Sequence, residues 1–106
     1  MKFNIVVVPP DGGEANFSAP IKGNRIPQKG EYIQLTEEDG TSYFLVRNII
    51  SCFEEDDSSV KDFSETGIHV EVEPLDYEMQ SPSQQRMIER YKTEGYTVKQ
   101  YIPSGY

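Results

Sequence analysis

The stretch that most constrains the fold is Thr41 to Phe53, because apolar side chains fall on both of its alternating faces. One parity carries Phe44, Val46, Ile50 and Cys52, and the other carries Tyr43, Leu45, Ile49 and Phe53. A strand that is apolar on both faces is either central in a sheet or strongly bent, as at the corner of a small barrel. We therefore expect a long strand here, around which the rest of the chain is arranged.

Shorter alternating segments on either side predict further strands. Lys2–Val8, Ala15–Lys22 and Tyr32–Leu35 precede the long strand, and Gly67–Pro74 and Tyr96–Tyr101 follow it. Turn residues separate these segments, and Asp39-Gly40 in particular suits a tight hairpin.

In the segment from Ser81 to Gly95, the spacing of apolar residues changes from every second residue to the spacing of a helix. Ser81 is a good N-cap, Pro82 suits the first helical position, and Gln84 would complete a capping box. An apolar stripe follows at helical spacing, at Met87, Ile88 and Tyr91. Gly95 suits the C-terminal cap, so a helix is expected over about 82–94, before the last strand.

Together these elements predict a mainly β (α+β) fold in a single domain, residues 1–106. We expect an SH3-like or partly open β-barrel of five to six short strands with one helix. The pattern Pro27-x-x-Gly30-Glu31-x-Ile33, leading to an Asp-Gly hairpin and an apolar strand, is similar to the opening of SH3-like small barrels. This resemblance is to an architecture over about half the chain, and an architecture implies no function.

The charge of the chain is distributed unevenly. Of a net charge of −8, residues 31–78 carry −12, while residues 1–30 and 79–106 carry +2 each. Direct binding to a nucleic acid is not expected, because it needs clustered Lys and Arg. The acidic middle instead predicts a protein partner with a basic surface.

The predicted contact residues begin with four adjacent carboxylates, Glu54, Glu55, Asp56 and Asp57. Such groups repel one another unless a cation or basic side chains neutralise them. Glu71 and Glu73, which alternate with Val70 and Val72 and are expected to face outward, would extend this surface. Tyr101 and Tyr106 are further candidates, since tyrosine is enriched at interfaces.

A calcium loop is a weaker interpretation of the acidic run. Glu54, Asp56, Ser58, Asp62 and Glu65 fall at positions one, three, five, nine and twelve of the twelve-residue template. However, Ser59 occupies the position that needs glycine, and the flanking segments are expected to be strands. A solvated loop is favoured over a metal site, and no cofactor is expected.

Catalytic groups are sparse. His69 is the single histidine and reads as an exposed strand residue, while Cys52 reads as a small buried hydrophobe. A Cys52–His69 dyad is disfavoured because acidic surroundings raise the pKa of a thiol. There is no Gly-rich phosphate loop, nucleophile elbow or zinc knuckle, so we expect no enzyme.

The leading hypothesis is therefore a small, non-catalytic, acidic interaction protein. A specific version is a phage or bacterial inhibitor whose carboxylates imitate a nucleic acid. The alternatives are a structural or assembly component that acts through sheet edges, and a calcium-binding β domain. With one cysteine and no secretory signal, the chain is expected to be cytoplasmic, and its longest apolar stretch, Ile5–Val8, is too short for a membrane span. The oligomeric state stays open.

Overall fold

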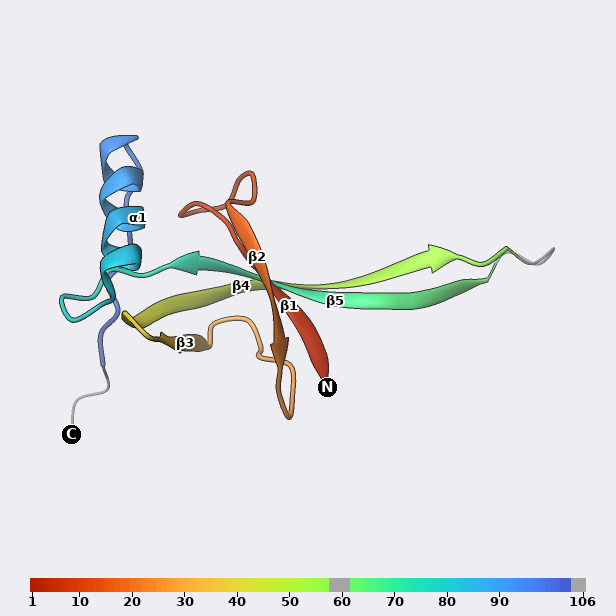
Figure 1. Cartoon of the computed structure of the whole chain (residues 1–106). Coiled ribbons are helices and arrows are strands. Elements are labelled where there is room, and N and C mark those ends of the chain that lie inside the picture. The colour runs from red at the N-terminus through yellow and green to blue at the C-terminus, as the bar shows by residue number, and fades with distance from the viewer. Residues whose placement is uncertain (58–61, 104–106) are drawn as a thin grey trace.

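The computed structural model describes residues 1–57 and 62–103, within which the chain forms five strands and one helix (Figure 1). The elements are β1 (Lys2–Val7), β2 (Phe17–Lys22), β3 (Tyr32–Glu37), β4 (Gly40–Glu55), β5 (Phe63–Pro74) and α1 (Pro82–Thr93). The strands form a sheet in the order β2-β1-β5-β4-β3, curled into a half-barrel. The prediction of a mainly β fold with a partly open barrel is confirmed.

One strand pair in the sheet is parallel. β1 pairs in parallel with β5, from Asn4 opposite His69 to Val7 opposite Val72, whereas the other neighbours are antiparallel. The sheet is thus an N-terminal hairpin, β1–β2, joined through β5 to the meander β3–β4–β5.

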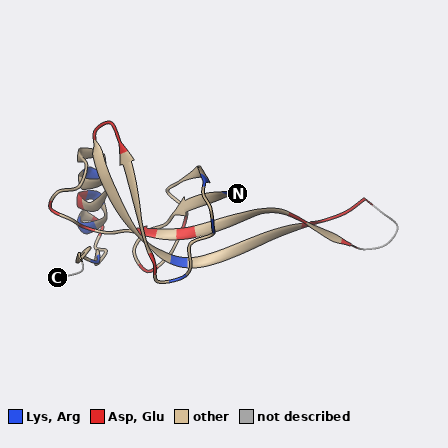
Figure 2. Ribbon diagram, turned by 90° about the horizontal axis from the view of Figure 1, so that it is seen from below, with Lys and Arg blue, Asp and Glu red and all other residues tan. Residues whose placement is uncertain are grey.

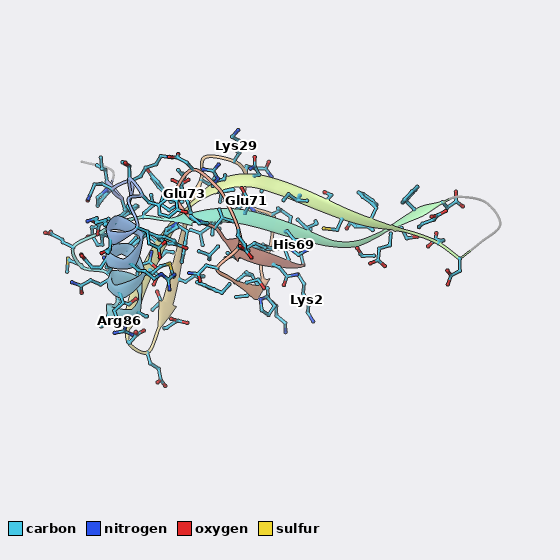
Figure 3. The ribbon with its side chains drawn as sticks, turned by 90° about the horizontal axis from the view of Figure 1, so that it is seen from above. Lys2, Lys29, His69, Glu71, Glu73 and Arg86 are labelled. Atoms are coloured by element: carbon cyan, nitrogen blue, oxygen red, sulfur yellow. The ribbon has the colours of Figure 1, made fainter. Side chains whose placement is uncertain are left out.

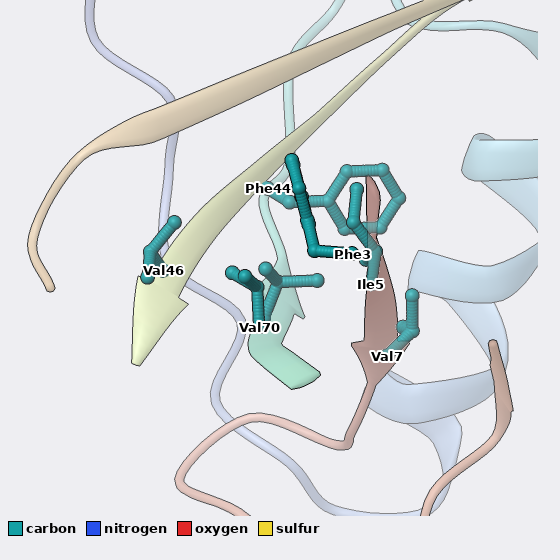
Figure 4. Packing of buried hydrophobic residues seen from close by; sticks show 7 residues of the cluster. Phe3, Ile5, Val7, Phe44, Val46 and Val70 are labelled. Carbon is teal, nitrogen blue, oxygen red and sulfur yellow. The ribbon is translucent and has the colours of Figure 1, made fainter. Parts of the chain in front are cut away.

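The core lies on the concave face of the half-barrel (Figure 4). Its buried members alternate along three strands: Phe3, Ile5 and Val7 of β1, Phe44 and Val46 of β4, and Val70 and Val72 of β5. Because successive strand residues point to opposite faces, this spacing of two places every one of these side chains on the same side. Met87 of α1 packs against the cluster.

The helix begins where the sequence predicts. Ser81 is the N-cap, its Oγ accepts a hydrogen bond from the backbone N–H of Gln84 at 3.2 Å, and Gly95 follows the helix with φ of +95°. The predicted capping box is wrong in one respect. The side-chain Nε2 of Gln84 donates to the carbonyl oxygens of Tyr43 and Leu75 instead of reaching back to the N-cap, so this buried side chain fastens the helix to the sheet.

Replacing Ser81 by alanine is expected to lower the free energy of unfolding by about 1–2 kcal/mol, the usual cost of losing an N-cap. The side chain is buried, and its Oγ also lies 3.1 Å from the hydroxyl of Ser42. Urea unfolding followed by circular dichroism measures the loss. Ser83→Ala is the matched control, because the Ser83 hydroxyl bonds to an exposed Asp39 carboxylate. Equal losses in the two variants would contradict this role of Ser81.

The strand expected after the helix is not formed. Residues 96–103 make a single isolated bridge, Asp76 with Gln100, so the prediction that the helix precedes a last strand is wrong. The alternation of Tyr96–Tyr101 is real, but this segment lies beside the loop after β5 and not beside a strand edge. Two backbone hydrogen bonds hold it there, each 2.8 Å long. The N–H of Asp76 donates to the carbonyl oxygen of Lys99, and the N–H of Tyr101 donates to the carbonyl oxygen of Asp76.

The strands β4 and β5 continue well beyond their neighbours. β3 pairs with β4 as far as Leu45, and β1 pairs with β5 over residues 69–72, yet β4 and β5 pair out to Glu55 opposite Phe63. We call residues 48–57 and 62–68 the arm. It extends the molecule to 55 Å along its longest axis and raises the radius of gyration to 16.0 Å, against about 13 Å for a compact domain of this length. No helix in the described chain is long and apolar enough to cross a membrane.

Candidate interaction surface

The tip of the arm is acidic and exposed. Six carboxylate residues lie there: Glu54, Glu55, Asp56, Asp57, Asp62 and Glu65. The backbone N–H of Asp56 donates to the oxygen of Asp62 at 2.8 Å, and Ser64 donates its hydroxyl to the Asp56 carboxylate at 2.9 Å, so the ribbon is hydrogen-bonded up to this point. The described arm residues include no Lys or Arg. The predicted contact residues 54–57 are therefore brought together, in solvent, at the tip.

Large apolar side chains are exposed along the same arm. Ile50, Phe53 and Phe63 are 45%, 53% and 64% exposed. Phe53 lies opposite Glu65, and Phe63 lies opposite Glu55, so the register places both rings on one face as diagonal neighbours. Sequence reasoning missed Phe63, because it took the residues after the acidic run for loop. The repeat of an aromatic residue on each side of that run was the signal that could have found it.

The acidic residues do not form one continuous region. Glu37, Glu38 and Asp39 form the β3–β4 turn beside α1, where Ser83 donates to the Asp39 carboxylate at 2.9 Å. Figure 2 shows this turn at the end of the molecule opposite to the arm tip. The excess acid of residues 31–78 is therefore split between two places, since the turns before and after a strand as long as β4 lie at opposite ends of the sheet.

Glu73 is fully buried, so the prediction that it faces outward is wrong. Its Oε2 accepts from Arg47 Nη1 at 2.6 Å and from the Asp11 N–H at 3.3 Å, and its Oε1 lies 2.9 Å from Lys99 Nζ. Arg47 is an extra residue in β4 at a β-bulge, and a bulge redirects side chains. Alternation from Leu45, which lies opposite Glu73, already places Arg47 on this face, where its Nε also donates to Glu71 at 3.3 Å. The bulge shifts the residues after Arg47, so that Asn48 also lies on this face, opposite Glu71.

The charges of this cluster are mutually stabilised. Burial alone would raise the pKa of Glu73, but the ion pair with Lys99 and hydrogen bonds from Arg47 and the Asp11 N–H outweigh burial and lower its pKa. The hydrogen bond from Glu73 raises the pKa of Arg47, against the opposing effect of burial. Glu73 therefore stays ionised inside the protein, where it ties together β4, β5, the β1–β2 loop and the C-terminal segment.

A hollow of about 310 Å³ opens beside this cluster at the base of the arm. Its lining includes three cationic side chains, Lys29, Arg47 and Lys99, together with Asn48 and Glu73. We call it the basic hollow. Figure 3 shows Lys29, Glu71 and Glu73 at the body end of the arm, far from its tip.

Of the two tyrosine candidates, Tyr101 and Tyr106, the structure describes the surroundings of the first. Tyr101 is half-buried in a cluster, stacked on Tyr43 at a centroid distance of 4.2 Å, with Tyr32 and Tyr77 edge-on to it at 5.1 and 5.3 Å. Its first role is thus to hold the C-terminal segment on the sheet. Tyr106 lies outside the described residues.

The remaining candidates are not assembled into a reactive site. Of the calcium template, Ser58 lies outside the described residues, and the register places Glu54 and Glu65 on opposite faces of the arm. Within residues 1–57 and 62–103, no three His, Cys, Asp or Glu side chains are placed to hold a metal ion. Cys52 and His69 share a face of the sheet as diagonal neighbours at the base of the arm, and both are only half-buried.

Comparisons of the chain with protein-family models, with curated proteins and with solved structures found no match.

Proposed function

We propose that this chain is a non-catalytic interaction protein whose binding element is the arm. The observation that carries the proposal is the extension of β4 and β5 beyond the sheet with Phe53 and Phe63 exposed. A two-stranded ribbon gains little stability by itself in water, and exposed aromatic side chains add a solvation cost. A partner that covers the arm would remove both disadvantages.

The chemistry of the tip indicates the character of the partner. Six carboxylates with no described basic neighbour on the arm favour a protein surface rich in Lys and Arg. The narrower version, an inhibitor that imitates a nucleic acid, would have to use this tip, because the other exposed acidic turn lies at the far end of the sheet. The SH3-like likeness adds no separate function to this proposal, since architecture and function are independent.

Assembly through sheet edges is the second candidate. Both strands of the arm carry an edge with no partner strand in the described chain, and such edges add strands from other chains.

Reversing two tip charges, Glu54→Lys with Glu55→Lys, is expected to weaken partner binding about five- to thirtyfold. Each reversed contact changes the interaction by about 0.5–1 kcal/mol or more, and 1.4 kcal/mol is tenfold. A photoreactive phenylalanine analogue at position 53 would trap whatever covers the arm in cells that produce the protein. The affinity of the trapped protein is then measured at rising salt.

The matched control reverses Glu37 and Glu38, two exposed acidic residues at the opposite end of the molecule. This control is expected to keep wild-type affinity and wild-type salt dependence. If the tip variant and the control trap the same proteins with the same affinity, the arm tip is not the binding element.

A further inference from the structure

We propose that the outer edge of β4 in the arm pairs antiparallel with the same edge of a second copy of this chain. The acidic tip of each arm then lies against the basic hollow at the base of the other. This inference rests on the proposed function and names the partner of the arm as a second copy.

The outer edge of β4 is available for pairing. β3 pairs with β4 as far as Leu45, and two further hydrogen bonds, from Gly30 N–H to Val46 oxygen and from Val46 N–H to Glu31 oxygen, cover one more residue. Residues 48–55 then have β5 on one side and no strand of the described chain on the other. Their outward backbone groups have hydrogen-bonding capacity that a strand from another molecule would use.

The β5 edge of the arm is less suited to pairing. Its register with β4 shifts between Cys52, opposite Gly67, and Phe53, opposite Glu65, so Thr66 is an extra residue in β5. A bulge of this kind bends a strand and disrupts a ladder, and proteins use it to protect edges. Residues 48–55 of β4 contain no such interruption, because the β4 bulge falls earlier, at Arg47.

Symmetry restricts the register of the pairing. In a twofold dimer of antiparallel strands, the axis relates one residue to its own copy, and opposed residues share a face. An axis at Ser51 sets Phe53 opposite Ile49, Ile50 opposite Cys52 and Asn48 opposite Glu54 of the second copy. An axis at Cys52 would instead set Phe53 opposite Ser51 and Ile50 opposite Glu54. The axis at Ser51 is the better choice because it pairs apolar with apolar side chains.

Charge complementarity supports the same register. With the axis at Ser51, Glu54 of the second copy lies beside Asn48, a lining residue of the basic hollow. Gly30 and Glu31 occupy the β4 edge at Val46, so the carboxylates that follow Glu54 leave the strand edge there, beside the hollow that Lys29 and Arg47 line. Each acidic tip thereby lies near Lys29 and near Arg47 and Lys99, whose charges Glu73 partly offsets, and the two tips remain at opposite ends of the dimer.

The first test is the oligomeric state of the full-length chain by sedimentation velocity over a concentration series. The wild-type chain is expected to sediment as a dimer at micromolar concentrations. Ser51→Lys sets two lysines against each other on the axis and is expected to weaken dimerisation at least about tenfold, since like charges opposed across a strand pair repel. Ser18→Lys, at an exposed serine of the edge strand β2, is the matched control and should remain dimeric.

The second test reports the register by disulfide formation under copper–phenanthroline and oxygen. Directly opposed residues on antiparallel strands have Cα atoms about 4.5–5.5 Å apart, within disulfide range. Ser51→Cys in a Cys52→Ser background is therefore expected to cross-link rapidly. Native Cys52 is a diagonal neighbour of its copy, about 7–8 Å away or more, and is expected to cross-link slowly. Ser18→Cys in the same background gives the rate at which cross-links form by random collision between molecules.

A wild-type chain that remains a monomer throughout the series would overturn the dimer, as would Ser51→Cys cross-linking at the rate of the Ser18→Cys control. If such a monomer still traps a different protein in a manner that depends on Glu54 and Glu55, the proposed function stands and the choice of partner is wrong. If the wild-type chain is dimeric and Ser51→Lys does not disturb it, the dimer forms elsewhere and this inference is also overturned.

Discussion

Replacing Arg47 by methionine is expected to lower the free energy of unfolding by about 3 kcal/mol, because it leaves Glu73 buried with one fewer cation. The loss is at the low end of the range for a broken buried ion pair, since Lys99 remains 2.9 Å from the Glu73 carboxylate. Glu73→Gln should cost less. It leaves Arg47 and Lys99 without the charge, but these side chains are 24% and 49% exposed and recover hydration. Urea unfolding followed by tyrosine fluorescence and circular dichroism measures both.

The pH dependence separates this electrostatic cause from lost packing. In the wild-type fold the pKa of Glu73 is lowered, so the ion pairs contribute fully above about pH 5, and their contribution is lost as the pH falls further. In Arg47→Met, burial weighs more heavily and raises the pKa of Glu73 relative to the wild type. The deficit of the variant should therefore shrink as the solution is acidified. A deficit that is constant with pH, or a cost for Glu73→Gln equal to that for Arg47→Met, would contradict this account.

Phe44→Ala is expected to lower the free energy of unfolding by about 3–5 kcal/mol, which would leave a domain of this size close to unfolded. Phe44 is 2% exposed and lies at the centre of the concave core (Figure 4). Phe53→Ala removes the same ring from the same strand, yet should cost about 1 kcal/mol or less, because Phe53 is 53% exposed. Both variants are compared by urea unfolding in the Ser51→Lys background, so that contacts between the arms of two molecules do not contribute to the free energy of unfolding. Comparable losses would mean that the arm is packed into the fold and is not an exposed contact element.

Local sequence signals were sufficient for most of the elements. The alternation in Lys2–Val8, the turn at Glu37–Gly40 and the capping residue Ser81 each depend on residues close by in the chain, and each element was found where expected. The long apolar stretch from Thr41 was also correctly predicted as one strand. The strand continues two residues beyond the predicted end at Phe53, because Glu54 and Glu55 still pair with Ser64 and Phe63 of β5.

The errors came from contacts between distant residues. Alternation assigned Glu73 to solvent, but Arg47 of β4, the β1–β2 loop at Asp11 and Lys99 of the C-terminal segment contact it and bury it. Alternation also predicted a strand over Tyr96–Tyr101, but a strand needs a free edge alongside it, and the sequence pattern carries no information on where edges lie. The β5 side of the arm was missed because residues 63–66 follow the acidic run and carry one apolar side chain, Phe63, so they lack the alternating apolar pattern of a core strand.

The parallel pairing of β1 with β5 has a consequence for how the chain acquires its structure. Asn4 and His69 are neighbours in the sheet but lie far apart in the sequence, whereas each hairpin closes over a short loop. During synthesis the β1–β2 hairpin leaves the ribosome long before β5 exists, so its apolar face must wait for the C-terminal half of the chain. Joining the two halves closes the longest loop of any strand pairing in the sheet, and loop-closure entropy makes such a late, non-local step slow. Until that step is complete, the bare edge of β1 is the part of the nascent chain most prone to mispairing.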